Sequence, residues 1–109
     1  MKMSNHSISK TMKKKTYKYN GKTVSLKASQ YQHGGTLAVV METEDGESYV
    51  ITTNLRSPFQ SESMAFLDTN NYPKIESFIQ KNNLGLPMGV NEASGFCTYP
   101  LYTIFTNSL

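Results

Sequence analysis

Cysteine, histidine, arginine and long apolar runs are scarce in this 109-residue chain, and each shortage excludes a class of protein. The single cysteine, Cys97, rules out an internal disulfide framework and any metal site built from several cysteines. The longest apolar run covers residues 37–41. A membrane span requires ~18 apolar residues, so we expect no membrane association. No apolar segment follows the lysines near the N-terminus, so we also expect no secretion signal.

The remaining composition suffices for one small folded unit. Hydrophobic residues make up 38% of the chain and aromatic residues 11%, well above the range of disordered proteins. Typical domains contain roughly 100–150 residues, so we expect a single domain over residues 13–109. Residues 1–12 are polar and show no periodicity, which predicts a disordered leader.

The two halves of the chain carry opposite charge. Residues 1–41 hold eight lysines and no acidic residue, a net charge of +8. Residues 42–109 hold three basic residues against eight acidic ones, a net charge of −5. Such an asymmetry is typical of a protein whose basic end meets an anionic partner. A lysine-rich start that only aids solubility, or a basic segment that packs beside the acidic half, explains it as well.

The first expected element is a hairpin around Asn20-Gly21, the preferred residue pair of a two-residue type I′ turn. This position pairs Tyr19 with Lys22 and Tyr17 with Val24. Because side chains alternate along a strand, one face should be apolar and the other solvated. The apolar face carries Tyr17, Tyr19, Val24, Leu26 and Ala28. The solvated face carries the lysines Lys14, Lys18 and Lys27.

A second hairpin joins two strand-like segments, residues 36–43 and 47–54. A two-residue loop between them would place Glu44 directly opposite Glu47, which is unfavourable. A three-residue loop with Gly46 in the left-handed conformation avoids this repulsion, so we expect the longer loop. The resulting register pairs Met41 with Tyr49 and Val39 with Ile51.

The second half of the chain predicts a helix. Residues 55–72 have the composition of a connection, with a short strand over residues 64–67. The helix should cover residues 73–83, because Pro73 suits a first helical turn. Its apolar stripe consists of Ile75, Phe78 and Ile79, at the spacing of one helix face. Gly85 is expected as the glycine that ends this helix.

The last segments complete the predicted architecture. Residues 86–89 are expected to form a loop and residues 96–105 a strand, in which Pro100 indicates an edge position or a bulge. The fold class is therefore α+β. We expect an antiparallel sheet of four to six strands, from two N-terminal hairpins and a C-terminal strand, with one helix packed on one face.

Residues suited to catalysis are few. Nucleophilic catalysis needs a nucleophile beside an oriented base, yet His6 lies in the leader and His33 in a glycine-flanked turn. Cys97 lies in a strand between aromatic neighbours, which favours a buried, inert thiol. A pair of His33 and Cys97 is the remaining enzymatic alternative. We therefore expect no enzyme.

Metal and cofactor sites are not expected either. The acidic cluster of Glu42, Glu44, Asp45 and Glu47 offers the oxygen ligands of a hard cation, but a solvated acidic turn is the commoner arrangement. No phosphate-cradling or dinucleotide-binding glycine motif is present. The prediction is a protein without a bound metal or cofactor.

Nucleic-acid binding is an alternative that the lysine-rich hairpin face supports. Lysines neutralise phosphates, but single strands also need aromatic platforms. The tyrosines of this hairpin are expected on its opposite face. Arginine, the usual reader of bases, occurs only as Arg56. The alternative is therefore weak binding without sequence specificity.

Several segments make the chain similar to a family of small proteins whose function is not known. They are residues 44–49, 64–68, 78–89 and 94–102, and the likeness spans residues 16–105. The family resembled is carried on bacterial phages, plasmids and integrative elements. The segments 85–89 and 94–100 look like its signature, and backbone geometry alone explains their glycines. No catalytic residue is implied.

The resemblance implies an accessory protein of a mobile element in the bacterial cytoplasm. Such proteins are similar in size and setting to host-defence inhibitors, including anti-CRISPR proteins that occlude a nuclease. The expected partner is therefore a protein, such as a CRISPR-associated nuclease. A pI near 9.0 excludes an acidic DNA mimic. The partner-binding residues that we predict are Lys14, Lys18, Lys27, Glu44, Asp45 and Glu47.

Overall fold

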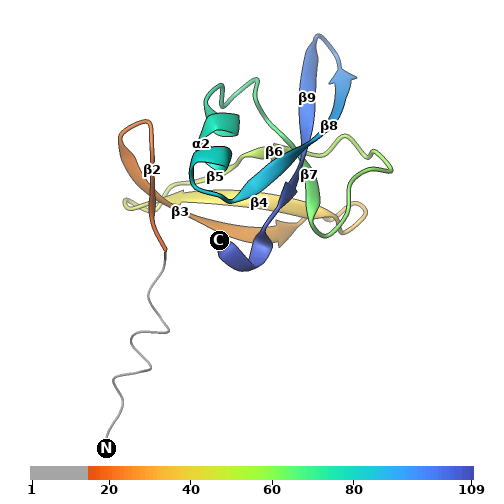
Figure 1. The fold of residues 1–109 in the computed structure, drawn as a ribbon. Helices are drawn as coiled ribbons and strands as arrows, with labels where there is room; N and C mark the ends of the chain where they lie inside the picture. Colours follow the sequence, from red (N-terminus) through yellow and green to blue (C-terminus); the bar gives the residue numbers. More distant parts are fainter. Residues whose placement is uncertain (1–14) are drawn as a thin grey trace, which may run out of the picture.

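The computed structural model describes residues 15–109, which form two four-stranded antiparallel sheets and an α-helix around a shared core (Figure 1). The N-terminal sheet, in spatial order, contains β2 (Tyr17–Tyr19), β3 (Lys22–Gln30), β4 (Leu37–Thr43) and β5 (Ser48–Val50). The C-terminal sheet, in spatial order, contains β6 (Thr52–Thr53), β7 (Met64–Leu67), β9 (Cys97–Ile104) and β8 (Gly85–Ser94). Helix α2 (Ile75–Lys81) precedes β8, and the 3₁₀ helix η1 (Thr106–Ser108) follows β9.

The predicted α+β class is confirmed, but the strands divide into two sheets at Ile51. The strand expected over residues 47–54 breaks there into β5 and β6. The Ile51 N–H donates to the Val39 carbonyl in β4 (3.0 Å), while the Ile51 carbonyl accepts from the Asp68 N–H (2.9 Å). The Val39 N–H donates to the Thr52 hydroxyl instead of a backbone carbonyl (3.2 Å). The chain can thus leave β4 without leaving buried polar groups unpaired.

Both predicted hairpin turns are confirmed. Asn20 and Gly21 have φ angles of 50° and 78°, as a type I′ turn requires, and Tyr17 pairs with Val24. In the second hairpin, Met41 pairs with Tyr49 and Gly46 has a φ of 90°, as the three-residue loop demands.

The core lies between the two sheets and the helix. The predicted helix stripe of Ile75, Phe78 and Ile79 is buried. The Phe78 ring meets the rings of Tyr19 and Tyr17 edge-on, with centroids 5.3 and 6.1 Å apart, so the helix packs on the N-terminal sheet. The apolar face predicted for β3 includes the buried Val24 and Leu26.

Ala28 departs from the predicted apolar face of the first hairpin. It is exposed and lines an open cleft with Leu37 and Thr106. The alternation is correct, since Ala28 pairs with the buried Val39.

The helix is shorter than predicted, and Gly85 does not cap it. Residues 73–74 and 82–83 form turns, and Asn83 adopts the left-handed conformation with a φ of 55°. Gly85 instead begins β8, where a Cβ atom would collide with the Thr103 carbonyl oxygen of β9. The glycine is needed for close approach rather than for helix termination.

The loop predicted over residues 86–89 is also wrong, because β8 runs without a break from Gly85 to Ser94. β8 is an edge strand, which tolerates Pro87, and its register is irregular between Pro87 and Asn91. Pro100 lies in β9, the strand between β7 and β8. The pairing of β9 with β7 covers Leu101 to Thr103, so Pro100 is paired with β8 alone. Its missing N–H therefore costs no pairing with β7.

Candidate protein-binding surfaces

Two surfaces of the protein are candidates for the binding of a partner. The first, which we call the charged end, is where the turns of the β2–β3 and β4–β5 hairpins lie side by side. A shallow cleft there is lined by Lys18, Lys22, Thr43, Glu44 and Asp45, among others. The structure thus brings the predicted residues Lys18, Glu44 and Asp45 together, with opposite charges facing one cleft.

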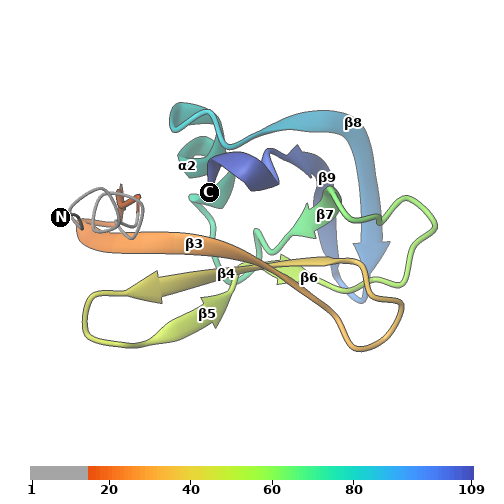
Figure 2. The ribbon, with the colours of Figure 1, turned by 90° about the horizontal axis from the view of Figure 1, so that it is seen from below.

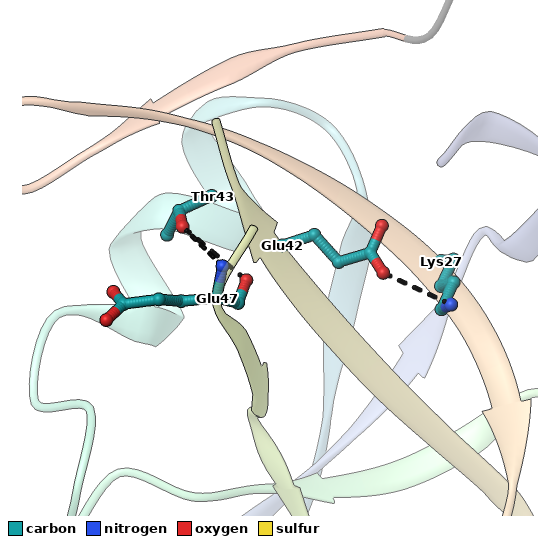
Figure 3. Close-up of polar contacts among 4 residues, drawn as sticks. All are labelled: Lys27, Glu42, Thr43 and Glu47. Atoms are coloured by element: carbon teal, nitrogen blue, oxygen red, sulfur yellow. Dashed lines mark hydrogen bonds and ion pairs between the residues drawn. The ribbon is translucent and has the colours of Figure 1, made fainter. Parts of the chain in front are cut away.

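The lysines of the predicted face are engaged by neighbours. The Lys27 ammonium group lies 3.2 Å from the Glu42 carboxylate of β4 (Figure 3). The Lys18 ammonium group donates to the Thr23 hydroxyl across the hairpin (2.6 Å). Lys14, the third lysine of that face, lies outside the described residues. Of the described lysines of this face, Lys27 thus has a charged partner and Lys18 a neutral one.

The acidic turn is organised by Thr43. The Thr43 hydroxyl donates to the Asp45 carboxylate, and the Glu47 N–H donates back to the same hydroxyl (3.1 Å; Figure 3). The hydrogen bond from Thr43 lowers the pKa of Asp45, with a smaller contribution from the nearby Lys22 charge. These contacts stabilise the conformation of the turn.

A tyrosine-lined groove beside the charged end was not predicted from the sequence. Tyr19, Tyr49 and Tyr72 line it, and the rings of Tyr49 and Tyr72 meet edge-on at 6.5 Å. The Tyr49 hydroxyl donates to the Glu47 carboxylate (2.7 Å), and this bond raises the pKa of Tyr49. Burial raises the pKa of Tyr72. The alternation of side chains along the strands predicts the faces on which Tyr19 and Tyr49 lie. Tyr72 lies in the loop before the helix, so no strand pattern could predict its position.

The second surface is the projecting hairpin, formed by β8 and β9, which rises beyond the body of the protein (Figure 1). Ser94 pairs with Cys97, and Gly95-Phe96 form the turn between them. Gly95 has a φ of 62°, the conformation that the first position of a type II′ turn requires. The turn directs Phe96 away from both sheets, and its side chain is fully exposed at 109% relative accessibility.

Further apolar side chains lie exposed along and beside the projecting hairpin. Leu86 and Met88 of β8 are both about half exposed, as is Phe59 in the loop between β6 and β7. The Ser57 hydroxyl donates to the Glu92 carboxylate (2.8 Å), which fastens this loop to β8. The segments 85–89 and 94–100, singled out in the sequence, both belong to the projecting hairpin, which is also called the arm below.

The arm is anchored at its base. Tyr102 is fully buried, and its hydroxyl donates to the Glu76 carboxylate (2.8 Å) and accepts from the Gln80 amide (2.6 Å) of α2. Gly85, opposite Ile104, packs closely against the backbone of β9. The base of the hairpin is thus rigidly packed, whereas its tip is free.

His33 and Cys97, the pair considered for catalysis, come from different parts of the fold, while His6 lies outside the described residues. His33 lies in the turn before β4 and Cys97 at the start of β9, and no hydrogen bond joins them within the described residues. Cys97 is half-buried rather than buried as expected, because it lies next to the tip of the arm. A hydrogen bond with the Cys97 side chain raises the pKa of Tyr99.

Two further observations concern the described residues as a whole. No three histidine, cysteine, aspartate or glutamate side chains of residues 15–109 gather closely enough to hold a metal ion. In the same part of the chain, no helix has the length and apolar character to cross a membrane.

Comparison with protein-family models assigns the chain to a family. A family model described as a domain of unknown function, DUF4313, matches residues 25–109, so the protein belongs to this family. The expected membership in an uncharacterised family is confirmed. Neither the curated proteins nor the solved structures contain a significant match.

Proposed function

We propose that this protein is a non-enzymatic binding protein whose anchor is the tip of the projecting hairpin. The observation that carries the proposal is the full exposure of Phe96. An aromatic side chain in water gains stability when a partner covers it, and aromatic anchors dominate the energy of many interfaces. A rigid base under the tip keeps the ordering cost of binding low.

The finer proposal concerns the partner. The similarity to proteins of phages, plasmids and integrative elements leads us to propose an accessory protein of a mobile element in the bacterial cytoplasm. Its partner would be a nuclease of host defence, such as a CRISPR-associated nuclease, inhibited by steric occlusion. The arm supports occlusion rather than DNA mimicry because residues 93–100 at its tip carry no charged side chain.

Nucleic-acid binding through the lysine face is the second proposal. It is the weaker one because Lys27 is paired with Glu42 and Lys18 shares a cleft with Glu44. Affinity for a duplex that depended on phosphate contacts would fall steeply with salt. Replacement of Lys14, Lys18 and Lys27 by glutamate would abolish it without unfolding the protein.

The test is capture of partners from nuclease-treated and untreated bacterial lysates. We expect a stoichiometric protein partner that survives nuclease treatment, and a loss of binding of at least about tenfold in Phe96→Ser. Val50→Thr, which changes an exposed apolar residue of β5, is the matched control and should bind normally. Since the sequence has no tryptophan, Phe96→Trp supplies a single tryptophan, whose emission should shift to the blue in the complex.

Two outcomes would contradict the proposal. If Phe96→Ser binds its partner as well as the unmodified protein, the arm is not the anchor. If all partners vanish on nuclease treatment and nucleic acid is recovered instead, the lysine face becomes the better explanation.

A further inference from the structure

A pocket of about 260 Å³ shares the loop between β6 and β7 with the projecting hairpin, because Ser57 of this loop lines the pocket and donates to Glu92 of β8. The turn between β3 and β4 lies beside this loop (Figure 2), and residues of both line the pocket. The turn is closed by hydrogen bonds from the Tyr31 N–H to the Thr36 carbonyl (2.9 Å) and from the Gly35 N–H to the Tyr31 carbonyl (3.1 Å). The pocket is lined chiefly by His33, Thr36, Asn54, Arg56, Ser57 and Gln60.

Gln60 sets the orientation of the polar groups in this pocket. Its side chain is buried, and its Oε1 atom accepts from the N–H groups of Leu55 (3.1 Å) and Ser57 (3.0 Å). Backbone N–H groups only donate, so the atom facing them must be the oxygen. The amide nitrogen therefore faces the other way and donates to the Thr36 hydroxyl (3.2 Å) and the Asn54 Oδ1 atom (3.1 Å).

This orientation leaves donors, rather than acceptors, free in the lining. The Asn54 Oδ1 atom also accepts from the Arg56 N–H (3.1 Å), so its two lone pairs are filled. The Asn54 Nδ2 group has no hydrogen-bond partner within residues 15–109 and keeps both hydrogens to donate. The Thr36 hydroxyl accepts from Gln60, so its own hydrogen also remains to be donated.

Arg56 adds a positive charge that no acidic group neutralises. Among the described residues its guanidinium group forms no ion pair or hydrogen bond, and no carboxylate lines the pocket. Glu92 does not line the pocket, but its carboxylate accepts from the hydroxyl of Ser57, which does (2.8 Å). Arg56 also has a φ of 55°, a conformation that costs free energy in a residue with a Cβ atom. His33 supplies a further donor to the same lining.

We propose that this pocket, here called the Arg56 pocket, binds a small oxyanion, the oxygen atoms of a carboxylate or a phosphate group. The planar guanidinium group suits two oxygen atoms at once, and Asn54 and Thr36 supply donors for the remaining lone pairs. The site does not depend on the proposed function. It would hold a free anion or an acidic group of a partner by the same contacts.

The test is a titration of the ¹⁵N-labelled protein with inorganic phosphate and, separately, with acetate at constant ionic strength. We expect saturable NMR shifts at the Asn54 side-chain amide, the Arg56 guanidinium and the N–H of Gly34, which also lines the pocket. Arg56→Gly should raise the dissociation constant about tenfold or more, because a charged hydrogen-bond partner is lost. It should fold well, since glycine accepts the φ of 55° without strain. Lys81→Gln, which removes one exposed positive charge from α2, is the control.

Every result bears on the proposal. A saturable response to phosphate, acetate or both that is weakened in Arg56→Gly and retained in Lys81→Gln supports it, and the stronger ligand identifies the chemistry. Shifts that grow without saturation overturn it, as do shifts that are equal in the two variants.

Discussion

The charged end and the projecting hairpin differ in where their polar and apolar groups lie. At the charged end, lysines and carboxylates of two hairpins line one cleft, and the Lys18 ammonium group donates to the Thr23 hydroxyl in solvent. In the projecting hairpin, polar contacts concentrate at the buried base, while the tip presents an apolar side chain without a cover. The comparison teaches that the sequence shows where charged residues lie, whereas only the structure shows which charged or apolar groups lack a partner.

This contrast predicts that stability depends on the base of the arm and little on the charged end. Exposed ion pairs and hydrogen bonds compete with water and contribute little to the free energy of unfolding. Contacts inside the core have no such competitor, so their loss is felt in full. The four predictions below test this contrast from the largest expected effect to the smallest.

Gly85→Ala should have the largest effect. The added Cβ atom would collide with the Thr103 carbonyl oxygen and press on Ile79 and Ile104, none of which can move without shifting the core. We expect a loss of about 3 kcal/mol in the free energy of unfolding, measured by urea denaturation. Gly95→Ala at the tip has open space around it and should lose only about 1 kcal/mol, from its positive φ. Equal losses at both glycines would mean that the base of the arm is not tightly packed.

Tyr102→Phe should have an intermediate effect. It removes a buried hydroxyl that links β9 to Glu76 and Gln80 of the helix, at a cost of about 1 kcal/mol. The matched change at the charged end is Tyr49→Phe, which removes an exposed bond to Glu47 and should cost less than about 0.5 kcal/mol. Thermal and urea unfolding of the two variants measure the difference. A larger loss in Tyr49→Phe would reverse the comparison.

The Lys27–Glu42 ion pair should contribute less again. The Lys27 side chain is 58% exposed and that of Glu42 26%, so water and salt screen their attraction. A double-mutant cycle with alanine at both positions should give a coupling of about 0.5 kcal/mol that vanishes in high salt. A coupling of several kcal/mol that persists in high salt would show that this ion pair contributes substantially to the stability of the fold.

Thr43→Val should change the titration of Asp45 more than it changes stability. Because the pKa of Asp45 is lowered in the folded state, its contribution to stability is present above the unfolded pKa and lost as the pH falls through the folded one. Removing the Thr43 hydroxyl should return the pKa of Asp45 toward its usual value of 3.8, as followed by NMR. An unchanged pKa in the variant would assign the shift to the hydrogen bond with the Asp45 backbone and to Lys22 instead.

The sequence could predict the features that depend on neighbouring residues. The type I′ turn at Asn20-Gly21 and the three-residue loop ending at Gly46 follow from backbone conformations that few residues adopt. The helix stripe follows from a spacing that places its residues on one face. The predicted partner-binding residues stay a prediction: the structure gathers Lys18, Glu44 and Asp45 at one cleft and pairs Lys27 with Glu42.

Only the tertiary structure decided the rest. The division into two sheets depends on the Thr52 hydroxyl meeting the Val39 N–H, and the role of Gly85 depends on the approach of β9. The exposure of Phe96 and the free donors around Arg56 depend on which segments, distant in the chain, come to lie beside them. Sequence patterns encode local conformation and the faces of an element. They do not encode distances between elements, and those distances decide which groups are paired and which remain free to bind.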